Sequence, residues 1–231
     1  MNEEYVIEPI AKIVSDLTGK FGVPRQAGIA EELLSEIVFL PEYSDRQMLR
    51  GIEEFSHLWL IWRFSENAGK GWSPTVRPPR LGGNERRGVL ATRSPFRPNA
   101  LGLSCVKLVS VNDSGKGMPT LTVAGADLMN GTPIVDIKPY IPYADCIPDA
   151  LSGFAPDSGK RVNVVFAQGT ENKIPEEKLP GLKKILSLDP RPQYIRDGER
   201  EYSFEYAGRT VSFTVLDGTL TVTDIKQLPE K

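Results

Sequence analysis

The stretch between Lys70 and Lys107 carries the densest set of side chains that could bind a charged ligand. It contains eight basic residues against a single acid, Glu85, which gives a local charge of +7. Five prolines restrict its backbone, and stiff loops that carry arginine suit a phosphate-rich ligand. The basic residues are Lys70, Arg77, Arg80, Arg86, Arg87, Arg93, Arg97 and Lys107. The alternative is that several of them pair with acids elsewhere in the chain, namely Glu31, Glu32, Glu36, Glu53 and Glu54.

Two polar segments combine charged side chains with glycine or proline and offer little apolar surface. Residues 93–99 read RSPFRPN and lie shortly before Gly102, whereas residues 127–133 read DLMNGTP. A polar turn with glycine can bring backbone amides close to a ligand. Both segments are therefore candidate binding turns.

The scarcity of cysteine and histidine excludes several kinds of site. The chain has two cysteines, Cys105 and Cys146, and one histidine, His57. A disulfide scaffold, a cysteine-rich zinc site and a multi-histidine metal hydrolase therefore do not fit, and we expect no metal. His57 stands at the start of the apolar run 58–62, where a lone histidine is more often structural than catalytic. No G-x-G-x-x-G turn supports a Rossmann-type nucleotide site.

Composition indicates an ordinary globular protein. The 231 residues are 40% hydrophobic and 25% charged, which suits one large domain or one domain with a small appendage. The net charge of -2 means that a nucleic acid would have to be held by a local patch. The acidic start lacks a signal-peptide pattern, and the longest apolar run, 58–62, is too short to cross a bilayer. We therefore expect a cytoplasmic protein without membrane contact.

Short strands dominate the first two thirds of the chain. A capping box at residues 44–47 (SDRQ) predicts one short helix that ends near Gly51. Many short strands with long connections favour a barrel or a sandwich over a βαβ array. The expected strands are 5–14, 57–64, 88–92, 103–111, 120–127 and 134–139.

A polar stretch, residues 148–161, predicts a surface linker between two domains, 1–155 and 156–231. A strand at 162–167 is expected first, followed by apolar spacing over 175–188 that predicts two short helices split at Pro180 and Gly181.

Alternating apolar residues then predict a three-stranded meander at the end of the chain. Its turns contain Ala207-Gly208 and Asp217-Gly218, and the second pair is a strong two-residue hairpin signal. The predicted fold class is mainly β, with an antiparallel barrel and a small C-terminal α+β domain.

Five longer stretches form a chemically unusual combination. They are VPRQAG (23–28), GIEEFSHLWLIW (51–62), GWSPTVRPPRLGGNERRGVLATRSPFRPNALGLS (71–104), DLMNGTPIVDIKPYIPYAD (127–145) and DPRPQY (189–194). In these stretches the sequence closely resembles the TrmO family, also called YaeB-like or TsaA-like. The resemblance implies an antiparallel β-barrel, typically dimeric, that binds S-adenosylmethionine. It also implies methyl transfer to N6 of the threonylcarbamoylated adenosine at position 37 of tRNA, next to the anticodon.

The resemblance also implies a set of cofactor contacts. Three positions depart from the pattern of many relatives: Ser65 replaces histidine, Ala100 replaces the second proline of RPNP, and Asn130 replaces aspartate before Gly-Thr-Pro. Serine and asparagine still donate and accept hydrogen bonds, so we expect altered contacts rather than lost function. The implied cofactor residues are Pro24, Arg25, Gln26, Ser65, Glu66, Arg93, Leu103, Asp127, Leu128, Asn130, Gly131 and Thr132.

Asp136 and Lys138 are the candidates for acting on the nucleophile of that reaction. They lie two residues apart, so a strand would place them on the same side. N6 of the modified base belongs to a urea-like group, and loss of its proton before or during transfer would raise its nucleophilicity. The alternative is a structural ion pair at the barrel rim.

The tRNA partner would be an anticodon stem-loop held through its phosphates, with unstacked bases resting on an aromatic side chain such as Phe96 or Tyr194. The loop 189–194 is expected to fold back over the active site. The candidate tRNA-binding residues are Arg77, Arg80, Arg86, Arg87, Arg97, Arg191 and Tyr194.

Two other functions remain open at this point. One is a non-catalytic β-barrel that binds RNA or senses S-adenosylmethionine after the changes at Ser65 and Asn130. The other is a methyltransferase that acts on a different substrate. Transfer of label from S-adenosylmethionine to tRNA, with and without the threonylcarbamoyl group, separates all three.

Overall fold

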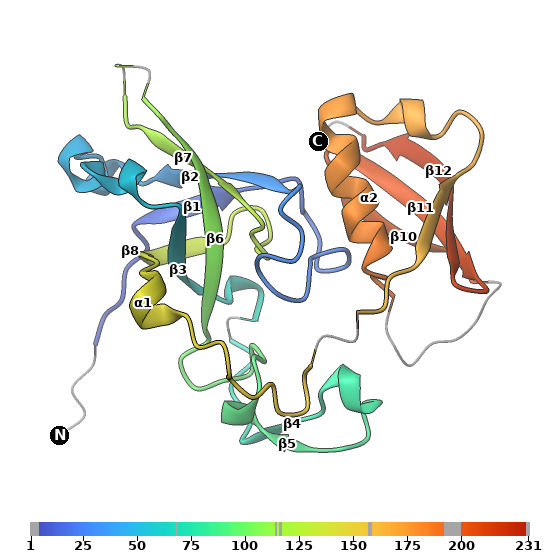
Figure 1. The fold of residues 1–231 in the computed structure, drawn as a ribbon, viewed down its shortest axis with the longest axis horizontal. Coiled ribbons are helices and arrows are strands. Elements are labelled where there is room, and N and C mark those ends of the chain that lie inside the picture. The colour runs from blue at the N-terminus through green and yellow to red at the C-terminus, as the bar shows by residue number, and fades with distance from the viewer. Residues whose placement is uncertain are drawn as a thin grey trace.

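The computed structural model describes residues 5–67, 69–113, 115, 117–156, 159–191 and 200–229. It contains a closed six-stranded barrel, a C-terminal domain beside it and an irregular extension that is drawn below both in Figure 1. The mainly β architecture predicted from the sequence is confirmed. No helix in the described residues is long and apolar enough to span a membrane.

The barrel closes in the order β1-β2-β7-β6-β3-β8, and every pair of neighbours is antiparallel. Inward side chains alternate with outward ones, which is why Leu58, Leu60 and Trp62 of β3 are buried while Trp59 and Ile61 are partly exposed. The barrel strands are β1 (Ala11–Val14), β2 (Leu34–Phe39), β3 (His57–Arg63), β6 (Leu101–Asn112), β7 (Thr120–Ala124) and β8 (Pro133–Pro139).

The connections of the barrel are short 3-10 helices, one turn of α-helix and a small ribbon. The ribbon, β4 (Thr75–Val76) with β5 (Arg87–Gly88), belongs to the extension that carries most of the predicted tRNA-binding arginines (Figure 1). The helices are η1 (Pro41–Tyr43), η2 (Arg46–Leu49), η3 (Ile52–Glu54), η4 (Ser65–Asn67), η5 (Pro79–Leu81), η6 (Val89–Ala91) and α1 (Pro142–Asp145).

Three element predictions in the barrel were wrong in detail. The expected strand 5–14 is reduced to β1, because Pro9 has no N–H to donate to a ladder. The short helix predicted from the capping box at 44–47 is replaced by η2 and η3, and the cap is Asp45, whose Oδ1 accepts the backbone N–H of Gln47 at 2.9 Å. The expected strand 88–92 is mostly η6, which buries Val89 and leaves Leu90 exposed.

The C-terminal domain has a four-stranded sheet in the order β10-β11-β12-β9, with α2 (Leu179–Ser187) packed on one face (Figure 1). The predicted meander is confirmed, and β9 adds a parallel edge strand beside β12. The strands are β9 (Asn163–Phe166), β10 (Tyr202–Tyr206), β11 (Arg209–Leu216) and β12 (Thr219–Gln227), and η7 (Glu171–Lys173) and η8 (Glu176–Lys178) precede α2.

Pro180 and Gly181 do not split this helix, contrary to the prediction. Pro180 lies in the first turn of α2, where a missing N–H costs no helical hydrogen bond. Gly181 is buried, and an added Cβ there would come within 3.0 Å of Tyr206 Oη and of a Leu33 methyl group. The glycine therefore allows the helix to approach the sheet closely.

The core of the C-terminal domain also includes residues from far earlier in the chain. Leu17, Ala30 and Leu33 are buried in the same cluster as the apolar side chains of α2 and β10 to β12. Asp16 accepts a hydrogen bond from Lys178 at 2.7 Å, and its backbone oxygen accepts the N–H of Ala207 at 3.1 Å. Segment 16–33 therefore fixes the C-terminal domain against the barrel.

Candidate active site

The partly buried carboxylate of Asp127 is the centre on which several predicted site residues converge. Ser104 of β6 donates a hydrogen bond to Asp127 Oδ1 at 2.5 Å. Burial raises the pKa of Asp127 above its ordinary value, while hydrogen bonds from Ser104 and the Ala27 backbone and the nearby charge of Arg93 act in the opposite direction. Burial is the larger effect. A carboxylate in such a place is a typical feature of a functional site.

Arg93 and Gln26 join this centre from two separate loops. Arg93 Nη1 donates to Gln26 Oε1, and Arg93 is close enough to Asp127 to influence its charge. The loop that carries Gln26 is anchored by the N–H of Gly28, which donates to the oxygen of Gly125 at 2.9 Å. The structure therefore brings together three residues that the sequence predicted for one site, Gln26, Arg93 and Asp127.

The turn after Asp127 is held by strand β1 rather than open to a ligand. The backbone N–H groups of Asn130 and Gly131 donate to the oxygens of Leu17 (2.7 Å) and Ile13 (2.8 Å). The Asn130 side chain accepts from Ser15 N at 3.2 Å. The expectation that this turn offers free amides to a ligand is therefore wrong for Asn130 and Gly131, because both amides complete hydrogen bonds to the β1 segment.

Two further residues of this turn face the protein interior. Leu128 is 1% exposed and belongs to the barrel core. Thr132 is buried, its hydroxyl donates to the oxygen of Met129 at 2.7 Å, and its backbone N–H donates to the same oxygen at 3.1 Å. Their side chains stabilise the turn itself.

A second group of predicted residues lies on the outer face of the barrel. Ile61 of β3 pairs with Leu103 of β6 on one side and with Asp136 of β8 on the other, so the three lie in one row across the strands. Leu103 is 56% exposed and, as the neighbour of buried Ser104, points away from the barrel interior. Lys138 Nζ lies 3.6 Å from Asp136 Oδ2, as expected from their spacing.

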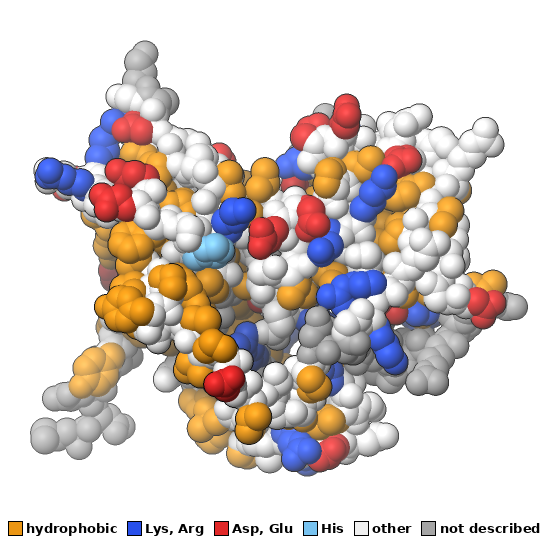
Figure 2. Space-filling view, viewed as in Figure 1, with side chains coloured by type: hydrophobic (Ala, Val, Ile, Leu, Met, Phe, Trp, Pro, Cys, Tyr) orange, Lys and Arg blue, Asp and Glu red, His pale blue; other side chains and the backbone are white. Residues whose placement is uncertain are grey.

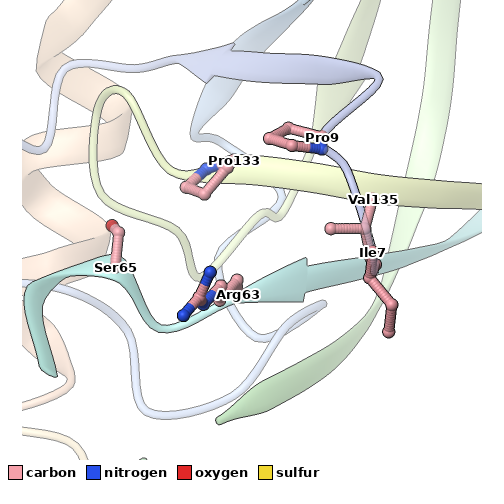
Figure 3. A pocket seen from close by; sticks show the side chains of 6 residues that line it. All are labelled: Ile7, Pro9, Arg63, Ser65, Pro133 and Val135. Carbon is pink, nitrogen blue, oxygen red and sulfur yellow. The ribbon is translucent and has the colours of Figure 1, made fainter. Parts of the chain in front are cut away.

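Ser65 lies near this outer group. It lines a cavity of about 160 Å³ together with Arg63 at the end of β3 and Val135, the neighbour of Asp136 (Figure 3). Ile7, Pro9 and Pro133 complete the lining. Glu66, the next residue, is exposed, and its carboxylate lies 4.0 Å from Lys20 Nζ.

Three arginines meet where the barrel and the C-terminal domain adjoin. Arg25 Nη2 donates to the backbone oxygen of Arg191 at 3.2 Å, and Arg191 makes a bidentate pair with Asp189 at 2.8 and 2.9 Å. Burial and the neighbouring charge of Arg80 lower the pKa of Arg25, whereas Asp189 raises it. Basic side chains are visible along this boundary in Figure 2. The described part of the loop 189–194 thus lies against the loop 23–28 of the same chain.

Arg25 therefore lies in a group of basic side chains, although the resemblance implied that it contacts the cofactor. Its neighbour Pro24, another implied cofactor contact, is buried. Arg80 Nη1 also reaches across, donating to the backbone oxygen of Pro156 at 2.5 Å. Tyr194 lies outside the described residues.

The remaining arginines are mostly fixed by their own extension. Arg86 donates to Thr75 Oγ1 (2.8 Å) and Arg97 to the oxygen of Thr92 (3.0 Å), while Arg77 is exposed. Arg87 pairs with Glu85 at 2.6 Å rather than with one of the five glutamates considered above. Of those glutamates, Glu31 does pair with a member of the stretch, Lys107, at 3.7 Å.

Sequence reasoning missed the residues that support Asp127. Ser104 and Trp62 are buried and joined by a hydrogen bond from Trp62 Nε1 to Ser104 Oγ at 2.9 Å. One signal was present, because a serine at an inward position of an apolar strand needs a polar partner. Within the described part of the chain, no three His, Cys, Asp or Glu residues are grouped to hold a metal ion.

Comparison with known proteins decides the family. The family model of the tRNA-methyltransferase O N-terminal domain matches residues 12–146, and that of the TrmO C-terminal domain matches residues 160–228. The chain belongs to the TrmO family. The resemblance inferred from the sequence is thereby confirmed.

Relatives across the TrmO family match most of the chain. A protein of Escherichia coli K12 named tRNA (adenine(37)-N6)-methyltransferase is 42% identical over 202 residues, covering 84% of this chain and 85% of its own length. A protein of the same name from Eikenella corrodens is 44% identical over 169 residues, covering 71% and 93%. A crystal structure of TrmO from Pseudomonas aeruginosa superposes with a TM-score of 0.79 at 28% identity, covering 96% of this chain and 98% of that one.

Proposed function

We propose that this protein is an S-adenosylmethionine-dependent methyltransferase that methylates N6 of threonylcarbamoyladenosine at position 37 of tRNA. The observation that carries the proposal is membership of the TrmO family over both domains. The names of the E. coli and Eikenella relatives give the reaction as N6 methylation of adenine 37. The threonylcarbamoyl group and action in the cytoplasm are our own extensions of that activity.

The side chains present fit S-adenosylmethionine. The Arg93 guanidinium suits a carboxylate, Gln26 offers an amide, and exposed Leu103 offers apolar surface to an aromatic base. When bound, the cofactor supplies an electrophilic methyl group on a sulfonium. The task of the protein is then to align the reacting atoms and to exclude water.

Asp136 is our candidate for accepting the N6 proton, with Lys138 as its charged neighbour. Lys138 Nζ lies 3.6 Å from Asp136 Oδ2, so it can orient this carboxylate toward a substrate. Both side chains are substantially exposed on the outer face, where a large substrate can approach them. Asp136 also lies in one row with Ile61 and Leu103 across three strands. Leu103, a candidate cofactor contact, is therefore two strands away from Asp136, the proposed base.

We propose that the tRNA contacts the arginine-bearing extension and the boundary with the C-terminal domain. Arg25, Arg80 and Arg191 meet there with the carboxylate of Asp189, so positive charge is in excess among these four groups at the boundary. The hydrogen bonds that fix Arg80, Arg86 and Arg97 hold part of each guanidinium and leave other N–H groups for phosphates. Phe96, partly exposed, is a surface on which a base can stack.

We also propose a homodimer formed through the outer face of β3, β6, β8 and α1. Tyr143 and Ile147 are 92% and 70% exposed there, and Figure 2 shows hydrophobic side chains gathered beside the single histidine. Exposed apolar patches of this kind mark interaction sites.

The decisive experiment is methyl transfer from labelled S-adenosylmethionine to defined tRNA. We expect label only in tRNA that carries the threonylcarbamoyl group at adenosine 37. Label in unmodified tRNA or in another molecule would show that the protein methylates a different substrate. Cofactor and RNA binding without any label would instead assign a non-catalytic binding module.

A further inference from the structure

A chain of three side chains leads from the barrel core to the candidate site. Trp62 Nε1 lies 2.9 Å from Ser104 Oγ, which lies 2.5 Å from Asp127 Oδ1. An indole nitrogen can only donate a hydrogen bond, so Ser104 accepts from Trp62. The single hydroxyl proton of Ser104 is then free to point at Asp127. The direction of both hydrogen bonds is therefore fixed by chemistry.

The same carboxylate is held from the loop side. Asp127 accepts the backbone N–H of Ala27, and Arg93 lies near it. Arg93 in turn donates to Gln26, the residue before Ala27. Asp127 thus connects two loops to the barrel wall, and its oxygens are occupied by protein donors.

We infer that Asp127, Ser104 and Trp62 are positioning residues that hold Arg93 and Gln26 in place for the cofactor. This rests on the proposed function, because Arg93 and Gln26 are assigned there to S-adenosylmethionine. Ser104, 1% exposed inside the barrel, acts only through its neighbours. The side chain of Asp127 is likewise a support for the site and not a contact to the reacting atoms.

The variant Ser104→Ala tests this inference because it removes one hydroxyl and little volume. Loss of a buried hydrogen bond to a carboxylate is worth about a tenfold change in an equilibrium. We expect S-adenosylmethionine to bind Ser104→Ala about tenfold more weakly in calorimetry, with the single-turnover rate at saturating cofactor within about threefold of wild type. Ser104→Thr, which keeps the hydroxyl, should restore most of the affinity. Ser110→Ala, an exposed position on the same strand that bonds Asn112, is the matched control.

A second measurement does not depend on the cofactor. The Ala27 amide should exchange with deuterium about tenfold faster in Ser104→Ala than in wild type, because its acceptor is less firmly held. Unchanged exchange and unchanged affinity would overturn the inference. A fall in the single-turnover rate with unchanged affinity would overturn it too, since it would place Asp127 in the chemical step.

The two hypotheses fail in different ways. If the wild-type protein does not bind S-adenosylmethionine, the proposed function fails, whereas faster Ala27 exchange would still support the hydrogen-bonded chain. If wild type binds and methylates as proposed but Ser104→Ala behaves like Ser110→Ala, the inference fails and the proposed function stands.

Discussion

The indole ring of Trp62 packs directly against the backbone of Gly102, its partner on the neighbouring strand β6. A Cβ added at Gly102 would come within 3.0 Å of three atoms of that ring. The φ angle of Gly102 is not in the left-handed region, so its backbone conformation does not require glycine. The close approach of the Trp62 ring does. Phe64 packs edge-on against the same ring, with centroids 4.3 Å apart. The position of Trp62, and hence of Ser104, depends on this glycine.

Gly102→Ala should therefore lower the free energy of unfolding by about 1 to 3 kcal/mol, the usual cost of overpacking a core. Urea unfolding followed by tryptophan fluorescence measures this change. Gly88→Ala is the matched control, because nothing lies within 4 Å of a Cβ at Gly88 and its φ of -57° suits alanine. Equal stabilities of the two variants would show that the barrel wall yields to the extra methyl group.

Arg80→Ala should weaken tRNA binding and reduce the slope of log K against log salt by about one unit, because one phosphate contact is lost. Binding titrations at several salt concentrations give the slope. Arg46→Ala is a suitable control, because Arg46 lies on η2 and pairs there with Asp113, which follows β6, at 2.7 Å. If the slope of Arg80→Ala matches that of Arg46→Ala, Arg80 does not contact a phosphate.

Asp136→Asn should reduce the single-turnover methylation rate by about a hundredfold, within the range for loss of a general base, while cofactor affinity changes little. Lys138→Ala should reduce it less, because it removes only the neighbouring charge. Rapid-quench measurement with saturating cofactor isolates this step. Asp224→Asn supplies a control pair, since Asp224 of β12 pairs with Lys173 of η7 at 2.6 Å in the C-terminal domain. Equal losses in the methylation rate and in cofactor affinity would show that Asp136 and Lys138 form only a structural ion pair.

The pH dependence of stability should contain a contribution from Asp127. Because burial raises the pKa of Asp127 in the folded protein, the folded state binds the proton more readily than the unfolded chain. This contribution to stability is complete below the ordinary pKa of 3.8 and is lost as pH rises through the folded-state pKa. The free energy of unfolding of wild type minus that of Asp127→Asn should therefore fall with rising pH and then level off. A difference that rises with pH would mean that Arg93 and the hydrogen bonds outweigh burial.

Tyr143→Glu and Ile147→Glu should weaken a dimer by about tenfold or more, because a charge would be buried against an apolar surface. Sedimentation equilibrium over a range of concentrations measures the dissociation constant. Leu216→Glu is the control, because Leu216 is equally an exposed apolar residue but lies on β11 of the C-terminal domain. If only Leu216→Glu dissociates the protein, the dimer forms through the C-terminal sheet instead.

The sequence by itself determined features that depend on near neighbours in the chain. Asp217 and Gly218 both have positive φ angles of 47° and 76°, as a two-residue hairpin between twisted strands requires. Tyr202, Phe204 and Tyr206 are all buried because side chains of a strand alternate between its faces. Asp136 and Lys138 share a side for the same reason.

Only the tertiary structure decided the contacts between distant segments. Ser104 meets Asp127 across 23 positions, and Arg25 meets Arg191 across 166. Strand pairing and the packing of segment 16–33 select these partners, and no local periodicity encodes them. The turn 127–133 was predicted to bring backbone amides close to a ligand, but the acceptors of the Asn130 and Gly131 amides, on Leu17 and Ile13, become visible only once the barrel has closed.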